Sequence, residues 1–323
     1  MFSKRQQIID YIEQGSIPQD KITETLVAAQ ITPDFKDWKH FIDAILLWLG
    51  GLALSFAVLF FIAYNWNEIG RFARFAMVEV AMVVAIVVYW RLGSHNMVAK
   101  VSLLAATLFL GVLLGLYGQT YQTGADTWQL FFNWALLMLP WALIGRFAAI
   151  WIIWILLINL SLGLYYSVFP GSFGFIFSSE TALFWLMFIF NTLALIAWEL
   201  LSNKWQWLDK AWAIRLLAVA SGVSVTTLAL YAVFSAPGVS SLSILVWVLW
   251  MAALFYTYRY LKHDLFMLAG FCLSGIVVVV AFFAQHMLDH ADAGAFLLLA
   301  LIVIGLGTGS AIWLRNIQRE WLS

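Results

Sequence analysis

Long apolar segments alternate with short polar connections through most of the chain. From residue 42 onward, each apolar segment is close to the ~20 helical residues that cross ~30 Å of hydrocarbon. This pattern predicts an all-α, polytopic transmembrane helix bundle of about ten spans. The spans are expected near residues 42–64, 72–90, 98–117, 129–145, 147–169, 180–201, 211–235, 240–261, 265–288 and 293–314.

The boundary between the fourth and fifth predicted spans is the least marked. Only Gly145 and Arg146 separate them, and Pro140 falls inside the fourth. Proline removes a backbone donor and its ring clashes with the preceding turn, so Pro140 and Gly145 are expected to interrupt this short span. Two arrangements fit the pattern, namely two separate spans or one bent unit.

The first 41 residues are more polar than the rest of the chain. Residues 3–14 and 18–30 have apolar side chains at helical spacing, and Gly15 marks a break between them. No apolar run is followed there by a small-residue cleavage site, so the first span is expected to remain as an uncleaved anchor. The predicted regions are a cytosolic helical hairpin at 1–41, the transmembrane bundle at 42–314 and a cytosolic tail at 315–323.

Basic residues predict the orientation of the bundle. Cytosolic loops of membrane proteins carry an excess of Lys and Arg. A cytosolic N-terminus and ten spans leave all but two of the 17 Lys and Arg residues on the cytosolic side, together with the C-terminus. The two exceptions, Arg71 and Arg74, lie in the first outer connection.

Composition supports a membrane protein and excludes other classes. The chain is 64% hydrophobic and 11% charged, whereas soluble domains have about 25% charged residues. Its formal net charge is zero, so it has no basic field for nucleic acid, and no nucleic-acid partner is expected. Cys272 is the only cysteine, which excludes a disulfide or a thiolate zinc site within one chain.

A polar, glycine-punctuated connection at residues 118–128 is the most distinctive stretch. It contains no Lys or Arg, and it offers Gln119, Tyr121, Gln122 and Asp126 as candidate binding residues. Amides and phenols bind neutral polar solutes through directional hydrogen bonds, and sugar or peptidoglycan-like material would suit them. The alternative is a capping loop that hydrogen-bonds its own helix ends.

The first outer connection shares this side of the membrane in the predicted topology. We expect Arg71 or Arg74 to contact Asp126 or Glu68, which makes both arginines candidate binding residues. The alternative is that these charges are solvated and only end the helices, because surface ion pairs are weak.

These two outer connections resemble the DUF2157 family of bacterial integral membrane proteins. The resemblance rests on Asn65-Trp66 followed by Arg71 and Arg74, on the stretch 117–126, and on the stretch from Trp134 to Trp141. It covers about residues 5–145. It implies location in the bacterial inner membrane, and it implies no activity.

One carboxylate is predicted to lie inside the membrane. Glu79 is about seven residues into the second span, ~10 Å of helix rise from its outer end. An ionisable side chain at that depth is costly and is a candidate functional group. Glu79 is either part of a solute or proton path that opens outward, with Asn133 as a candidate partner, or a structural glutamate.

Other polar positions favour structural readings. Asn159, Asn191 and Glu199 lie inside spans, where such residues usually form interhelical hydrogen bonds. The pairs Gly111–Gly115 and Gly305–Gly309 have the spacing of close helix packing.

His286 and His290 are spaced so that both imidazoles could reach one metal ion. No third ligand is evident, and a polar loop that ends a helix is a simpler explanation for these two histidines. The sequence therefore predicts no metal site and no cofactor.

The predicted function is a multi-pass, transporter-like inner-membrane protein that handles a polar solute through an outer-facing polar vestibule. The alternative is an envelope sensor or assembly factor that binds a partner through the 118–128 loop. An enzyme acting on lipid-linked sugar is less favoured, because the outer carboxylates are unpaired in the sequence. Expected partners are the lipid bilayer and a polar small molecule or envelope component.

Overall fold

Ten helices in the described part of the chain are long and apolar enough to cross a membrane, which confirms the predicted fold class. The computed structural model describes residues 8, 11–12, 14–29, 34–65, 68–172, 181–234, 241–287 and 293–322, and within them the chain contains no strand. The spanning helices are α3 (Phe35–Tyr64), α4 (Arg71–Leu92), α5 (Met97–Tyr121), α6 (Thr127–Gly145), α7 (Ala148–Val168), α8 (Ala182–Ser202), α9 (Ala211–Phe234), α10 (Ser241–Tyr256) with its π-helical continuation η2 (Thr257–Leu261), α11 (Leu265–Met287) and α12 (Ala293–Leu322).

The chain divides into two compact units. One consists of residues 1–50 and 308–323, and the other of residues 51–307. The first unit contains η1 (Gln19–Lys21), α2 (Ile22–Ala28) and the start of α3. The helix packing and the candidate site described below lie entirely within the second unit.

The predicted N-terminal hairpin is only partly covered by the described residues. Gly15 has a φ of +69°, and its amide donates to the carbonyl of Ile12 at 3.0 Å. The elements η1 and α2 together occupy Gln19–Ala28, inside the predicted helix 18–30. Most of the predicted helix 3–14 lies outside the described residues.

Helix α3 begins at Phe35, earlier than the predicted residue 42. Its start is set by two carboxylates that satisfy free amides of the first turn. Asp34 Oδ1 accepts from the Phe35 amide at 2.7 Å, and Asp37 Oδ2 accepts from the Asp34 amide at 3.1 Å. The prediction used the apolar run alone and therefore missed this charged first turn.

The fourth and fifth predicted spans are separate helices. Arg146 adopts a left-handed backbone conformation with a φ of +43°, which ends α6, and Phe147 is extended. The prediction that Pro140 interrupts the fourth span is wrong, because α6 continues through Pro140 to Gly145. Helices in membranes tolerate proline where neighbouring groups and small backbone adjustments satisfy the freed carbonyl.

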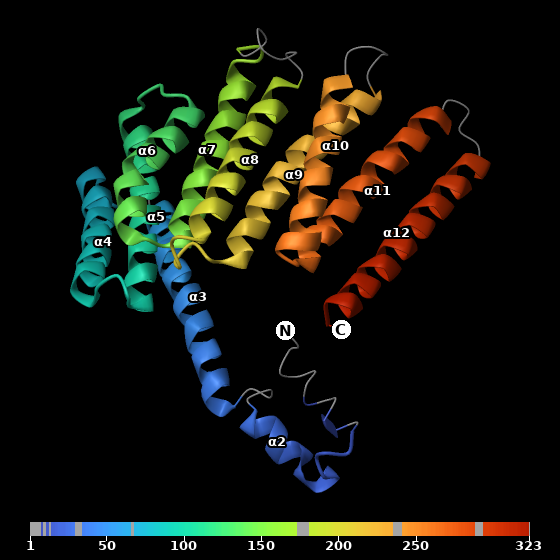
Figure 1. Ribbon diagram of the computed structural model, residues 1–323. Helices are drawn as coiled ribbons and strands as arrows, with labels where there is room; N and C mark the ends of the chain where they lie inside the picture. The colour runs from blue at the N-terminus through green and yellow to red at the C-terminus, as the bar shows by residue number, and fades with distance from the viewer. Residues whose placement is uncertain are drawn as a thin grey trace. The chain divides into compact units, whose positions relative to one another are not determined.

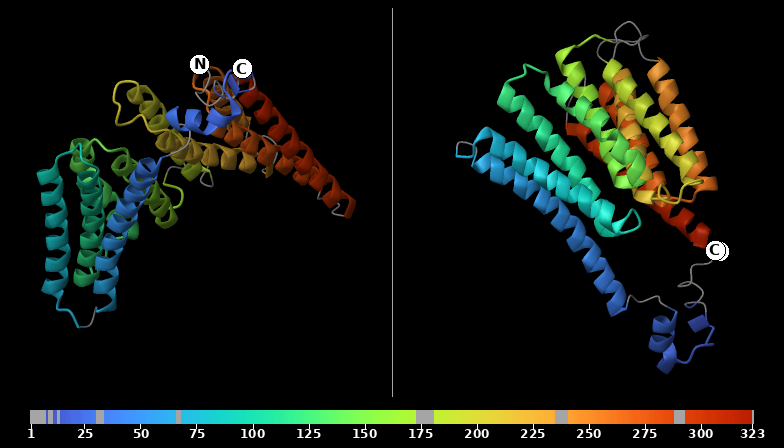
Figure 2. Two further views of the ribbon diagram at one scale, coloured as in Figure 1. Left: turned by 90° about the horizontal axis from the view of Figure 1, so that it is seen from below. Right: turned by 90° about the vertical axis from the view of Figure 1, so that its left-hand side faces the viewer.

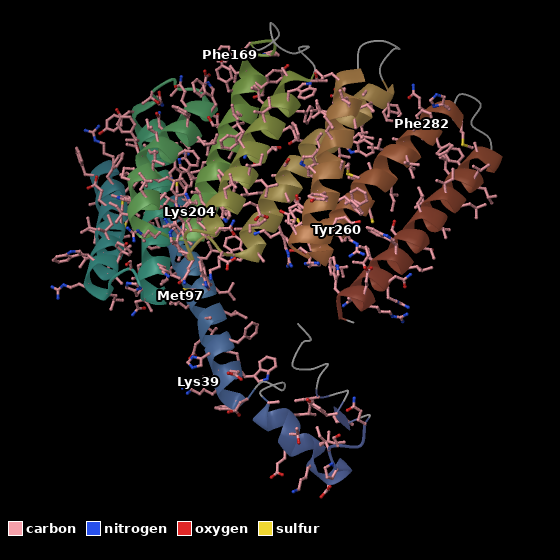
Figure 3. All side chains as sticks on the ribbon, viewed as in Figure 1. Lys39, Met97, Phe169, Lys204, Tyr260 and Phe282 are labelled. Atoms are coloured by element: carbon pink, nitrogen blue, oxygen red, sulfur yellow. The ribbon has the colours of Figure 1, made fainter. Side chains whose placement is uncertain are left out.

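The helices of the second unit pack mainly against their neighbours in sequence. Helix α4 lies along α5, α5 along α6 and α6 along α7, while α9 contacts α8, α10 and α11 (Figures 1 and 2). Figure 3 places Phe169 and Phe282 toward one end of these helices, and Met97 and Lys204 toward the other. Successive connections therefore alternate between the two ends, as the topology predicts.

Small residues are frequent among the fully buried positions, and many large apolar residues lie on the outside. Ala106, Ala135 and Ala142 are fully buried, whereas Leu54, Phe60 and Leu193 are each more than 60% exposed. Lipid tails are as apolar as leucine, so membrane helices gain little from burying large side chains and associate through close packing instead. This distribution is the one expected of helices surrounded by hydrocarbon.

Polar side chains tie neighbouring helices together within the spans. Asn159 of α7 and Asn191 of α8 exchange reciprocal amide hydrogen bonds of 3.0 and 2.7 Å. The hydroxyls of Thr192 and Ser221 lie 2.7 Å apart between α8 and α9. The interhelical role predicted for Asn159 and Asn191 is confirmed.

Charged groups make a second set of ties near the Lys204 end. The hydroxyl of Tyr258 donates to Glu199 Oε1 at 2.6 Å, and Lys262 Nζ lies 3.2 Å from Glu199 Oε2. The guanidinium of Arg215 donates to both carboxylate oxygens of Asp264, at 3.1 and 3.2 Å. These contacts connect α8 and α9 to η2 and to the segment between η2 and α11. Glu199 therefore forms polar contacts between helices.

The two glycines of the predicted pair on α5 have different surroundings. A Cβ at Gly111 would lie 2.5 Å from the Trp134 ring of α6, so this glycine allows close packing. A Cβ at Gly115 would meet no atom within 4 Å. The same is true of Gly305 in α12.

We expect replacement of one asparagine of the amide pair to destabilise the protein. Asn191→Leu leaves the Asn159 amide without its partner, at a cost of about 1–2 kcal/mol. The double replacement of Asn159 and Asn191 by leucine should cost less than the sum of the two single changes. Thermal unfolding in detergent measures this, with Thr227→Val as the control, because the Thr227 hydroxyl donates to the Val223 carbonyl of its own helix. Additive single effects would contradict the pairing.

The two glycines of α5 give a second prediction. Gly111→Ala should be less stable than Gly115→Ala by about 1–3 kcal/mol, because only the first overpacks against Trp134. The gain in helix propensity from glycine to alanine is common to both variants and cancels. Unfolding temperatures of the two purified variants test this, and equal values would show that the Trp134 ring moves aside without cost.

Candidate functional site

One face of α5 carries polar and small residues at its last two turns. Gly115, Gly118, Gln119 and Gln122 are spaced so that they lie on one side of the helix. The predicted loop boundary at residue 118 is wrong, because α5 continues to Tyr121. Gly118 therefore does not form a turn, and a Cβ there would meet no atom within 4 Å.

The start of α6 presents a matching face. Asp126, Gln129, Leu130 and Asn133 have the same helical spacing, beginning at the residue that precedes the helix. Gln129 and Leu130 were not predicted as site residues, and Asn133 was proposed only as a partner of Glu79. The helical spacing from Asp126 was the sequence signal that would have found them.

These two faces enclose an open cavity of about 560 Å³. Its size is within the ~300–1,000 Å³ of small-molecule sites. Among its lining residues, all in the described part of the chain, there is no Lys or Arg, and Asp126 is the one charged group. We call this cavity the polar hollow, and it is lined by Leu114, Gly115, Tyr117, Gly118, Gln119, Gln122, Thr123, Gly124, Ala125, Asp126, Thr127, Gln129, Leu130 and Asn133.

A tight connection brings the two faces together. Gln122 ends α5 in a left-handed conformation with a φ of +45°, and Gly124 has a φ of +64°. A residue other than glycine in this region costs about 1–3 kcal/mol and persists only where its surroundings hold it. The same conformation ends α6 at Arg146, so at Gln122 it ends α5 and turns the chain toward α6.

Contacts from α6 and α7 hold Asp126 in place. The Trp128 indole N–H donates to Asp126 Oδ2 at 3.3 Å, and the Trp128 ring meets Tyr165 edge-on with centroids 5.0 Å apart. Ser161 Oγ donates to the Trp128 carbonyl at 3.1 Å. Asp126 precedes α6 but forms no side-chain capping bond with it. Its carboxylate is thus not used to satisfy the helix end, unlike in the capping-loop alternative.

Tyr121 faces away from the polar hollow. Its ring packs on Tyr117, with centroids 5.0 Å apart, and on Phe75 of α4, with centroids 6.1 Å apart. Tyr121 therefore joins α5 to α4, while Tyr117 lines the hollow. Of the four predicted binding residues of this stretch, the structure brings together Gln119, Gln122 and Asp126.

Arg71 and Arg74 do not line the polar hollow either. Arg74 Nε donates to the carbonyl of Ile69 at 2.9 Å, and the Arg71 guanidinium lies 4.9 Å from the Phe72 ring centroid. These contacts fix the arginines at the start of α4. Neither Arg71 nor Arg74 is placed to contact a ligand in the polar hollow.

Glu79 lies on an exposed side of α4. Its neighbour Val78 is fully buried in the core cluster that α4 forms with α3 and α5. Glu79 is not among the residues that line the polar hollow. The hollow therefore does not form the predicted path down to Glu79.

The histidine candidates form no metal site within the described chain. His286 is exposed, its Nδ1 lies 2.8 Å from the Phe282 carbonyl, and its ring stacks on Phe282 at 4.4 Å. His290 lies outside the described residues. No group of three or more His, Cys, Asp or Glu side chains is placed for a metal ion in the part of the chain that the structure describes.

Comparison with known proteins gives a match to a protein family. Neither a curated protein nor a solved structure matches the chain. Residues 9–151 match a family described as "Predicted membrane protein (DUF2157)". The matched segment contains every residue that lines the polar hollow. The predicted resemblance is thereby confirmed, and the segment that forms the hollow is similar in sequence to the DUF2157 family of predicted membrane proteins.

Proposed function

We propose that the protein is a membrane-embedded binding protein that holds a neutral, hydroxyl-rich solute, such as a sugar, in the polar hollow. One observation supports this most directly. The side-chain amides of Gln119, Gln122, Gln129 and Asn133 line a single cavity that contains no basic residue. Each amide both donates and accepts hydrogen bonds, so the set complements hydroxyl and amide groups of a ligand.

The charge of the lining favours a neutral ligand over an anion. The Asp126 carboxylate would repel an anion at close range, and no lysine or arginine of the lining offsets it. The apolar surfaces of Leu114, Leu130 and Tyr117 supply the wall against which a sugar ring or methyl group packs.

Binding is better supported than transport. A transport path would need a continuous polar route across the membrane, and the carboxylate predicted for it, Glu79, is outside the lining of the hollow. Of the transporter-like function predicted from the sequence, the hollow supports only the binding of a solute.

A second candidate function follows from the exposure of the connection itself. Tyr121, Gln122, Thr123, Gly124 and Ala125 are all exposed. An envelope sensor or assembly factor would use this surface to contact a partner while the hollow holds a ligand. Both functions use the polar hollow to hold a ligand. In the second, a partner protein or envelope component also contacts the exposed connection.

We also propose that the hollow opens toward the outside of the bacterial inner membrane, with both termini cytosolic. The excess of Lys and Arg in the opposite connections supports this orientation. For the experiment, Cys272 is replaced by serine and single cysteines are introduced at Thr123 and Lys204, which are both exposed. A membrane-impermeant maleimide should label Thr123→Cys in intact cells and Lys204→Cys only after lysis. The reverse pattern would invert the orientation.

Calorimetric titration of the detergent-solubilised protein tests the binding function. N-acetylglucosamine is the probe, and sodium phosphate is the anionic comparison. We expect the sugar to bind and phosphate not to bind. Gln119→Leu should weaken the sugar by about 3- to 10-fold, the value of one hydrogen bond. Gln206→Leu is the matched control, because Gln206 is exposed in the 203–210 connection, away from the hollow.

Two outcomes would overturn the binding proposal. One is the absence of any heat from the sugar with the wild-type protein. The other is equal loss of affinity in Gln119→Leu and Gln206→Leu, which would place the ligand elsewhere.

A further inference from the structure

An apolar groove continues the polar hollow along α5. It has a volume of about 400 Å³ and runs between the outer half of α3, the middle of α5 and Trp134 of α6. We call it the apolar groove, and it is lined by Ser55, Phe56, Leu59, Ile62, Ala63, Leu108, Gly111, Val112, Gly115, Leu116, Gln119 and Trp134.

The two cavities share a boundary on α5. Gly115 and Gln119 line both of them, so one surface leads from the amide-lined end into the apolar part. From Gln119 to Leu108 the helix rises about 16 Å, which is a large part of one leaflet. All of these residues belong to the unit of residues 51–307.

The absence of a side chain at Gly115 keeps this passage open. A Cβ at Gly115 would meet no atom within 4 Å, whereas one turn away Gly111 is closed by the Trp134 ring. A leucine at position 115 would therefore project into the junction of the two cavities. Helix formation gives no reason for glycine here, because glycine in a helix costs about 1 kcal/mol relative to alanine.

We infer that the ligand is a glycolipid whose neutral sugar headgroup occupies the polar hollow and whose hydrocarbon chain occupies the apolar groove. This inference rests on the proposed function and names its ligand class. A free sugar would use only the amide-lined cavity and would leave the groove to bilayer lipid. A glycolipid matches both parts and the direct junction between them.

The headgroup determines which lipid is selected. A hydrocarbon chain gains little by leaving the bilayer for the groove, because lipid tails already provide an apolar solvent. Hydrogen bonds to the sugar therefore supply the preference, and the groove positions the chain. Anionic phospholipids are disfavoured, because the polar hollow offers a carboxylate and no basic side chain.

The experiment measures which lipid the protein retains. Protein is reconstituted in phosphatidylcholine nanodiscs that contain a small fraction of diacylglycerol carrying N-acetylglucosamine, and is then re-extracted in mild detergent. Mass spectrometry compares the bound lipids with the bulk. We expect the wild type to retain the glycolipid at several-fold its bulk proportion, and Gly115→Leu to retain it at the bulk proportion.

Two further variants control for damage to the fold. Gly270→Leu is the matched control, because a Cβ at Gly270 also meets no atom within 4 Å, and Gly270 lines a different cavity between α9, α10 and α11. It should retain glycolipid as the wild type does. Leu59→Trp fills the same groove from α3 and should lose the enrichment as Gly115→Leu does.

The outcomes separate this inference from the proposed function. If N-acetylglucosamine binds the wild type but the glycolipid is not enriched, the glycolipid inference is overturned and sugar binding stands. If glycolipid is enriched equally in the wild type, Gly115→Leu and Leu59→Trp, the groove does not hold the chain and the inference is overturned. If neither the sugar nor the glycolipid binds, both proposals are wrong.

Discussion

Hydrocarbon as the surrounding solvent is the constraint on which this structure depends. In a bilayer every backbone polar group must be satisfied inside the protein, so each spanning segment is a helix. The hydrophobic effect contributes little to helix association there, so the helices associate through close packing and polar ties. The reciprocal amides of Asn159 and Asn191 and the indole of Trp134, which donates to the Thr107 carbonyl at 2.8 Å, are such ties.

The same constraint explains where the polar hollow lies. Amides and carboxylates are costly at the centre of a bilayer, but near a helix end they reach water and other polar groups. The last turns of α5 and the first turns of α6 are at such ends, and the tight connection through Gln122 and Gly124 brings them face to face. The site is thus a consequence of two amphipathic helix ends joined by a short turn.

Sequence patterns predicted the helices better than the site. Runs of apolar residues placed the ten spans, because length and hydropathy decide that question locally. The orientation of a side chain depends in addition on where its helix ends. Tyr121 was expected in a loop with Gln119, but α5 continues through both, and two positions along a helix are about 200° apart around its axis. Glu79 shows the same limit, since its depth follows from the sequence, while its exposed side follows from the burial of Val78.

Three residues one helical turn apart on α5 show why spacing alone does not predict function. Gly111, Gly115 and Gln119 lie on one stripe of the helix. Gly111 receives the Trp134 ring, Gly115 borders open space, and Gln119 presents an amide to the polar hollow. The position of α6 decides between these roles, and the bond from Trp134 to the Thr107 carbonyl fixes α6 at the level of Gly111. This bond holds α5 and α6 together on the Gly111 side of Gly115. On the Gln119 side, the two helices leave the polar hollow between them.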